Sequence, residues 1–230
     1  MKQGFFVTGT DTGVGKTLIA SSLVYHFAQS GLRSVGMKPV AAGCEHANGS
    51  LISEDVAQLQ AASNIRLSPD VINPYAFEPA LAPHIAAEMA GARIELNHIE
   101  DAFKKAAAAA DILVVEGVGG FRVPLNDTED TADLAARLGL PMILVVGMRL
   151  GCLNHALLTV DSIAARGLSL AGWVANCIDP HMAAQKENLT ALSKRITAPC
   201  LGVVSYQAVA SYKTTATFLN PAELRNLVCA

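Results

Sequence analysis

A glycine-rich loop near the N-terminus constrains the fold of this chain more than any other segment. Residues 9–17, GTDTGVGKT, follow an apolar run over 4–8 and open a helical pattern over 17–29. A strand, a glycine loop and a helix in this order predict a phosphate-binding loop, because backbone N–H groups and the positive helix end converge on one anion. Thr10 occupies the slot of the standard pattern's first glycine, and Gly9 lies one position earlier. The alternative is a glycine turn that only starts a helix.

The residue types in this loop suit phosphate and magnesium chemistry. Backbone N–H groups around Gly13–Thr17 can wrap a phosphate, and glycines let the backbone approach it closely. Lys16 can reach the terminal phosphates, and the Thr17 hydroxyl can occupy one position on Mg²⁺.

Apolar runs alternate with helical patterns along the chain. The runs are 4–8, 34–37, 112–115, 142–146, 170–175 and 201–204, and the clearest helical patterns are 17–29, 154–165 and 183–196. Nearly continuous Val, Ile and Leu runs are typical of strands that are buried on both faces. We therefore expect an α/β fold of the P-loop NTPase kind, with a parallel sheet and helices on both faces. No Ser/Gly-rich linker divides the chain, so we expect a single domain over 1–230.

Three segments fit the alternation less clearly. Residues 68–84 contain four prolines and predict a long ordered loop, of a kind that is often functional. Residues 205–220 show no period from which structure can be assigned. Residues 104–110 are alanine-rich and predict the end of a helix.

Composition narrows the classes of partner. The 230 residues include 17 Lys and Arg and 20 Asp and Glu, for a net charge of −3, whereas a protein that neutralises nucleic-acid phosphates is basic. The apolar runs are far shorter than the ~18 residues that a membrane span needs. We expect neither nucleic acid nor membrane as a partner. Five scattered cysteines and the lack of a secretory apolar segment predict a cytoplasmic protein with reduced thiols.

Three charged residues are candidates for a site beside the loop. Glu116 ends the run 112–115, and Lys38 directly follows the run 34–37, so both belong at the edge of the sheet where ligands bind. Asp55 lies at the start of a helical stretch. Each has an alternative: a capping or surface Glu116, a solvated Lys38, and an Asp55 that caps a helix.

Several motifs together resemble the dethiobiotin synthetase family. They are GTDTGVGKT at 9–17, KPV at 38–40, NPY at 73–75, PH at 83–84, VEGVGG at 115–120, GCLNHA at 151–156 and AGWVAN at 171–176. The resemblance runs from about residue 4 to residue 204. The loop alone is less specific, because cobyrinate and cobyrate synthases resemble it.

The resemblance implies a reaction of ATP, Mg²⁺ and CO₂ with 7,8-diaminononanoate. It closes the ureido ring of dethiobiotin through a carbamate and a carbamic–phosphoric anhydride and releases ADP and phosphate. The family is a homodimer, and the resemblance implies that each substrate site is shared across the interface.

The resemblance also implies roles for individual residues. It implies that ATP is bound by Thr12, Gly13, Val14, Gly15, Lys16, Thr17, Leu18, Asp55, Glu116, Gly117, Val118, Gly119, Asn176, Cys177, Ser205, Tyr206 and Gln207. Lys16 and Lys38 are the catalytic residues, and Thr17, Asp55 and Glu116 are the metal ligands. Substrate binding falls to Lys38 and, from the opposite subunit, to Leu150, Gly151 and Asn154.

The chain departs from the family's pattern at several of these positions. Gly13 stands where the family usually has Glu, Ala42 replaces a common Ser, and Cys177 replaces a frequent Asp. Ser205 and Tyr206 replace the family's Pro and the residue after it.

Two other functions compete with this interpretation. Partner-positioning ATPase switches share the fold, but they typically carry a second Lys early in the loop, where this chain has Thr10 and Asp11. Amidotransferase-type synthetases of cobalamin synthesis carry an additional glutaminase domain, which we do not expect within 230 residues.

Overall fold

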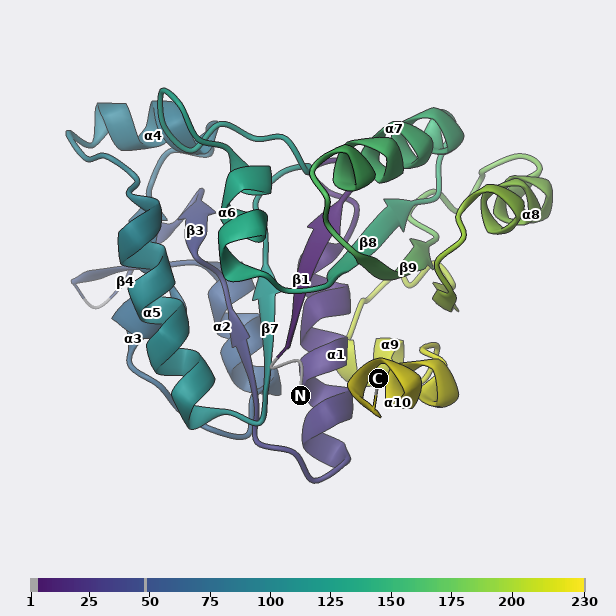
Figure 1. The fold of residues 1–230 in the computed structure, drawn as a ribbon, viewed down its shortest axis with the longest axis horizontal. Coiled ribbons are helices and arrows are strands. Elements are labelled where there is room, and N and C mark those ends of the chain that lie inside the picture. The colour runs from purple at the N-terminus through teal and green to yellow at the C-terminus, as the bar shows by residue number, and fades with distance from the viewer. Residues whose placement is uncertain (1–3, 48, 230) are drawn as a thin grey trace.

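A six-stranded parallel sheet forms the centre of the computed structural model, which describes residues 4–47 and 49–229 (Figure 1). The strand order is β10 (Cys200–Val204), β9 (Leu170–Asn176), β8 (Met142–Gly147), β1 (Gly4–Gly9), β7 (Ile112–Glu116) and β2 (Ser34–Met37). All neighbouring pairs are parallel. Each strand matches one of the predicted apolar runs to within a residue at either end. The parallel sheet predicted from these runs is confirmed.

Helices cover both faces of this sheet, as predicted. One face packs against α1 (Lys16–Gln29), α2 (Glu54–Ala62), α9 (Tyr212–Ala216) and α10 (Pro221–Cys229). The other packs against α3 (Pro69–Ile72), α4 (Pro83–Met89), α5 (Leu96–Ala109), α6 (Thr131–Leu138), α7 (Cys152–Ala165) and α8 (Gln185–Arg195). Successive strand residues serve opposite faces: Phe5 packs with the α1 side and Phe6 with the α5 side. The helix predicted to end in the alanine-rich stretch is α5.

The prediction of a long loop over 68–84 is wrong. This segment contains α3, the strand β6 (Tyr75–Phe77) and the start of α4. Pro69 and Pro83 each occupy the first turn of a helix, where a missing N–H costs nothing. Strand β6 pairs in parallel with β3 (Val40–Ala42) beside the main sheet. Two of the four prolines therefore start helices instead of interrupting structure.

Two further elements lie outside the predicted pattern. An antiparallel hairpin of β4 (Glu45–Ala47) and β5 (Ser50–Ile52) precedes α2, and α9 lies within the unassigned stretch 205–220. Ser53 caps α2 and thereby fixes the first turn that carries Asp55. None of the helices in the described part of the chain is long and apolar enough to cross a membrane.

The carboxyl ends of the parallel strands bring several of the predicted site residues to one edge of the sheet. The glycine loop follows β1, Lys38 follows β2, Glu116 ends β7 and Asn176 ends β9. Ligands bind at this edge in doubly wound sheets, since loops from both sides diverge there. The fold thus assembles a site from segments that are far apart in sequence.

The packing of β2 against α2 gives a testable prediction. A Cβ added at Gly36 would lie 2.7 Å from Leu59 Cδ2, closer than packed atoms approach. We expect Gly36→Ala to lower the free energy of unfolding by ~1–3 kcal/mol through overpacking, measured by urea denaturation. In a Leu59→Ala background the same substitution should cost clearly less, because Leu59 is the obstacle. Equal costs in both backgrounds would contradict this account of the packing.

Candidate active site

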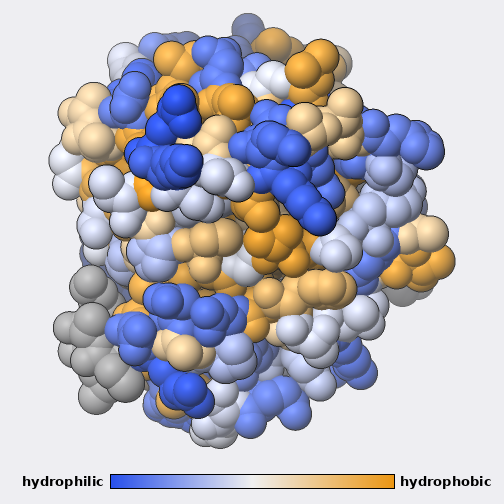
Figure 2. All heavy atoms as spheres, turned by 90° about the vertical axis from the view of Figure 1, so that its right-hand side faces the viewer, coloured by the Kyte–Doolittle hydropathy of each residue, from blue (hydrophilic) through white to orange (hydrophobic). Residues whose placement is uncertain are grey.

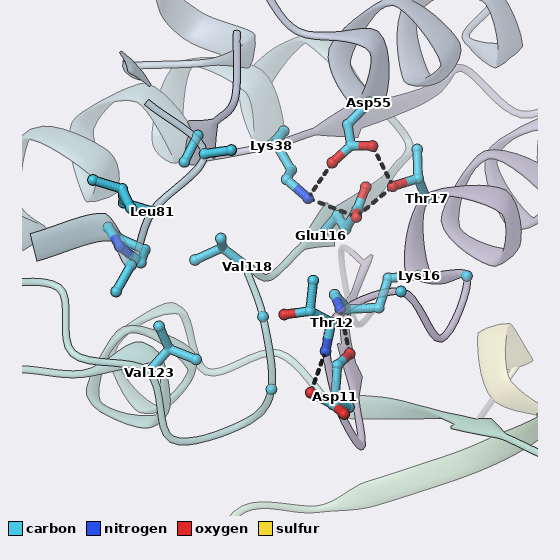
Figure 3. A pocket seen from close by; sticks show the side chains of 18 residues that line it. Asp11, Thr12, Lys16, Thr17, Lys38, Asp55, Leu81, Glu116, Val118 and Val123 are labelled. Carbon is cyan, nitrogen blue, oxygen red and sulfur yellow. Dashed lines mark hydrogen bonds and ion pairs between the residues drawn. The ribbon is translucent and has the colours of Figure 1, made fainter. Parts of the chain in front are cut away.

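A cavity of about 890 Å³ opens at the carboxyl edge of the sheet (Figure 3). Its walls come from the glycine loop, from Lys38, Asp55 and Glu116, and from the glycine turn after β7. Residues 80–83, which precede and begin α4, close the opposite side. The cavity therefore joins the predicted phosphate loop to every predicted catalytic and metal-binding side chain of this subunit.

The glycine loop has the geometry of an anion cradle. Gly13 and Gly15 have left-handed backbones, with φ of 74° and 88°, and Gly15 precedes the first turn of α1. Asn176, at the end of β9, donates from Nδ2 to the carbonyl oxygen of Val14 at 2.9 Å. A Cβ at Gly15 would lie 2.2 Å from that Nδ2 atom. Residue 15 must therefore be glycine, both for its φ and for this close approach.

Three predicted metal ligands meet although they come from three different elements. Thr17 Oγ1, at the start of α1, lies 2.8 Å from Asp55 Oδ1 of α2 and 2.8 Å from Glu116 Oε1 of β7. The hydroxyl carries one proton, so it donates to one carboxylate at a time. These contacts hold two acidic side chains against the phosphate loop.

Lys38 provides a shared counter-ion for this acidic pair. Its Nζ lies 2.7 Å from Glu116 Oε1 and 2.8 Å from Asp55 Oδ2, and 3.3 Å from the carbonyl oxygen of Gly117. Lys38 is 4% exposed and Glu116 1% exposed, so both charges are out of water. A buried charge is tolerated only when it is paired, and this cluster supplies the pairing.

The electrostatics of the cluster shift several pKa values. Burial raises the pKa of Glu116, and Lys38 only partly opposes that rise. Burial also disfavours the charged forms of Asp55 and Lys38, but charge pairing outweighs it. Lys38 lowers the pKa of Asp55, and Glu116 together with Asp55 raises the pKa of Lys38. Burial, with the nearby Lys38 charge, lowers the pKa of Lys16 to about 8. The two lysines thus face one cavity with different proton affinities.

The donor set fits a magnesium ion. Glu116 Oε2 is buried and lacks a hydrogen-bond partner in the structure, so it has a free lone pair at the cluster. Together with Thr17 Oγ1 and Asp55 it provides hard oxygen donors, which Mg²⁺ prefers. Across the described residues, no group of three or more His, Cys, Asp or Glu side chains stands ready to hold a metal. A cation here would need further oxygen ligands, which Mg²⁺ usually obtains from water and phosphate.

The remaining predicted residues divide into two sets. Thr12, Val118 and Gly119 line the cavity with Gly13 and Gly15, while Leu18 and Gly117 adjoin it in sequence. Cys177, Ser205, Tyr206 and Gln207 follow β9 and β10 at the same edge but lie outside the cavity wall. Gln207 donates instead to Thr215 of α9. The structure brings the loop and the charged cluster together, and it leaves this second set at the rim.

Leu150, Gly151 and Asn154 lie away from the cavity of their own chain. They form the turn between β8 and the first turn of α7, and Leu150 is 96% exposed. A single chain therefore does not bring these predicted substrate residues to its own cluster.

Sequence reasoning missed several residues of the cavity wall. Leu81, Pro83 and Val123 line it. Leu81 and Pro83 belong to the proline-rich segment 68–84, and Pro83 also to the PH motif, whereas no sequence pattern marked Val123. Asp11 also lines the cavity, and it forms an ion pair with Arg149, which follows β8. No local pattern marks Arg149, because the partners lie 138 residues apart.

The buried cluster predicts an unequal response of two lysines to substitution. Lys38→Met leaves Glu116 and Asp55 without their counter-ion, so we expect it to lower the free energy of unfolding by ~3–5 kcal/mol in urea without added metal. Lys104→Met is the matched control, since Lys104 pairs with Glu100 on the exposed surface of α5. It should cost ~0.5 kcal/mol or less. Equal costs at the two positions would show that the cluster does not stabilise the fold.

Comparisons with known proteins agree with the geometry. Residues 3–214 match a family described as AAA domain. The ATP-dependent dethiobiotin synthetases BioD of Aromatoleum aromaticum and Nitrosospira multiformis are each 56% identical over 206 residues, which is 90% of this chain and 92% and 89% of theirs. A ParA family ATPase from Chlorobium tepidum TLS has a TM-score of 0.55 at 14% identity, covering 99% of this chain and 97% of that one, and so shares the fold. The predicted family is confirmed: this chain belongs to the dethiobiotin synthetases.

Proposed function

We propose that this protein is a dethiobiotin synthase, which uses ATP to close the ureido ring of dethiobiotin from 7,8-diaminononanoate and CO₂. The observation that carries the proposal is the convergence of Lys16, Lys38, Thr17, Asp55 and Glu116 on one cavity beside the phosphate loop. Membership in the family supports the same reaction. The likeness to the ParA family ATPase concerns the fold and gives no support to a partner-positioning switch.

The proposed reaction has three steps that balance. One amine adds to CO₂ and loses a proton to give a carbamate. A carbamate oxygen then attacks the γ-phosphorus. This forms a carbamic–phosphoric anhydride, and ADP is the leaving group. The second amine attacks the carbonyl carbon and expels phosphate, which closes the ring. The proton of that amine can go to a phosphate oxygen, so the reaction needs no histidine.

The two lysines can offset the charge repulsion that these reaction steps involve. Carbamate and triphosphate are both anions, and their approach costs Coulomb energy in a cavity that is partly shielded from water. Lys16 lies in the phosphate loop and Lys38 on the adjacent wall, so their ammonium groups can offset that repulsion. Charge on the transferring phosphoryl group is stabilised by the same groups.

Thr17, Asp55 and Glu116 would hold the magnesium ion. When bound, the ion supplies positive charge to the phosphate oxygens and withdraws electron density from them. In this proposal Lys38 remains beside Glu116 and presents its ammonium to the carbamate.

Apolar residues of the cavity wall suit an alkyl chain. Leu81, on the side that residues 80–83 close, and Val118 and Val123, which follow β7, line the cavity (Figure 3), so methylene groups would meet apolar side chains. Ala42 also lines the cavity and offers no hydroxyl to the amines.

We propose that two copies share each site. The turn Leu150–Asn154 begins α7, whose free N–H groups and positive end suit a carboxylate of the substrate bound in the partner's cavity. Leu150 and Leu158 are exposed there, and Figure 2 shows apolar patches on the side of the molecule to which α7 and α8 project. A homodimer would cover them.

We place the reaction in the cytoplasm. The cysteines that the structure describes, Cys44, Cys152, Cys177 and Cys200, are unpaired, which suits a reducing compartment.

A product assay tests the proposed reaction. Diaminononanoate, bicarbonate, Mg²⁺ and ATP should give dethiobiotin and ADP in equal amounts. Lys16→Ala and Lys38→Ala should each lower turnover by at least ~100-fold, because each removes positive charge from the transition state. Lys104→Ala, on the exposed surface of α5, should stay near the wild-type rate. Near-normal turnover in a folded Lys38→Ala variant would remove Lys38 from the mechanism.

Mixed dimers test the shared site. Lys16→Ala and Asn154→Asp should each be nearly inactive, the second because its carboxylate repels that of the substrate. In refolded mixtures, a heterodimer has one site with both defects and one with neither. Random exchange gives half heterodimers, so activity should return to about a quarter of wild type. If mixtures in which subunit exchange has been demonstrated stay inactive, the two subunits do not share an active site.

A further inference from the structure

An ion pair ties the phosphate loop to the strand beside it. Asp11, inside the loop, accepts from Arg149 Nη2, and Arg149 follows β8. Both side chains are partly exposed, at 46% and 41%. Asp11 lines the main cavity, whereas Arg149 lies outside its wall. The arginine therefore contacts the cavity wall through Asp11.

Asp11 also organises the loop around it. Its Oδ1 accepts the N–H of Thr12 at 2.7 Å, and its backbone carbonyl oxygen accepts Lys16 Nζ at 2.8 Å. Asp11 thus hydrogen-bonds within the first turn of the loop and also holds the ammonium group of Lys16, the lysine expected to contact the phosphates. A displacement of Asp11 would disturb both contacts.

The position of Asp11 creates an electrostatic problem for an ATP-dependent enzyme. It is the single acidic residue among 9–17, and it lines the cavity that the triphosphate enters in the proposed function. Like charges repel, and the repulsion grows with the number of phosphates on the ligand. Solvent screens part of it, because Asp11 is half exposed.

We propose that Arg149 is a positioning residue for nucleotide binding, which neutralises Asp11 and fixes it in place so that the loop accepts polyphosphate. The inference rests on the ATP dependence of the proposed function and concerns affinity, not chemistry. Arg149 makes no contact with the cluster around Lys38 and is not itself part of the cavity wall, which it contacts through Asp11. Its effect should therefore fall on KM for ATP and leave kcat near the wild-type value.

The test compares ligands that differ only in phosphate number. AMP, ADP and ATP are titrated with Mg²⁺ by calorimetry, without diamine, into wild type and Arg149→Met. We expect Arg149→Met to weaken the binding of ATP by ~3–10-fold, that of ADP by less and that of AMP least. The reason is that a screened surface charge acts in proportion to the charge of the ligand. Added salt should narrow the differences, and Arg149→Lys should recover most of the affinity.

A second background separates this role from a merely structural one. In Asp11→Asn the carboxylate is gone, while Asn Oδ1 can still accept the Thr12 N–H. Arg149→Met should then cost clearly less ATP affinity than it does in the wild type, because the carboxylate that Arg149 neutralises is gone and only the direct attraction of its own screened charge is lost. The same loss in both backgrounds, or equal losses for AMP and ATP, would overturn the proposal.

The binding data stay informative if the proposed reaction fails. A graded loss across the three nucleotides with no dethiobiotin formed would contradict only the proposed reaction. Normal synthesis with unchanged ATP affinity in Arg149→Met would contradict only the role of Arg149.

Discussion

A buried ammonium between two carboxylates governs this structure. Strands β2 and β7 pair with Met37 opposite Val115, so the residues that follow, Lys38 and Glu116, emerge side by side. Both charges are buried, which would be strongly unfavourable for either alone. Asp55 completes the cluster from α2, so the three charged groups join β2, β7 and α2 at the edge where the phosphate loop lies.

The phosphate loop depends on the same arrangement. Thr17, in the first turn of α1, contacts both acids, while Asn176 donates to the Val14 carbonyl oxygen from the other side of the loop. The loop is thus bound to β7 and α2 on one side and to β9 on the other. A cradle held on two sides is organised before a nucleotide arrives, and preorganised charge is what phosphoryl transfer requires.

Much of this could be predicted from sequence because the signals are local. Buried parallel strands are continuous apolar runs, and Lys38 and Glu116 were marked by following two of them. The role of Asp55 was ambiguous, since an acidic residue at the start of a helix is an ordinary cap. Only the family resemblance favoured Asp55 as a metal ligand. Strands β3 and β6 have three residues each, too few to show a period, so proline counting produced a false loop. The Asp11–Arg149 pair joins distant segments that no local pattern relates.

The central claim is that the cavity brings a carbamate oxygen against the γ-phosphorus. Its most direct test follows oxygen from ¹⁸O-labelled CO₂ into the products, measured by mass spectrometry over times short enough to limit exchange with water. The proposed steps place one labelled oxygen in the released phosphate and one in the ureido carbonyl of dethiobiotin. Phosphate that carries no label beside labelled dethiobiotin would contradict the anhydride and the role assigned to the lysine-lined cavity.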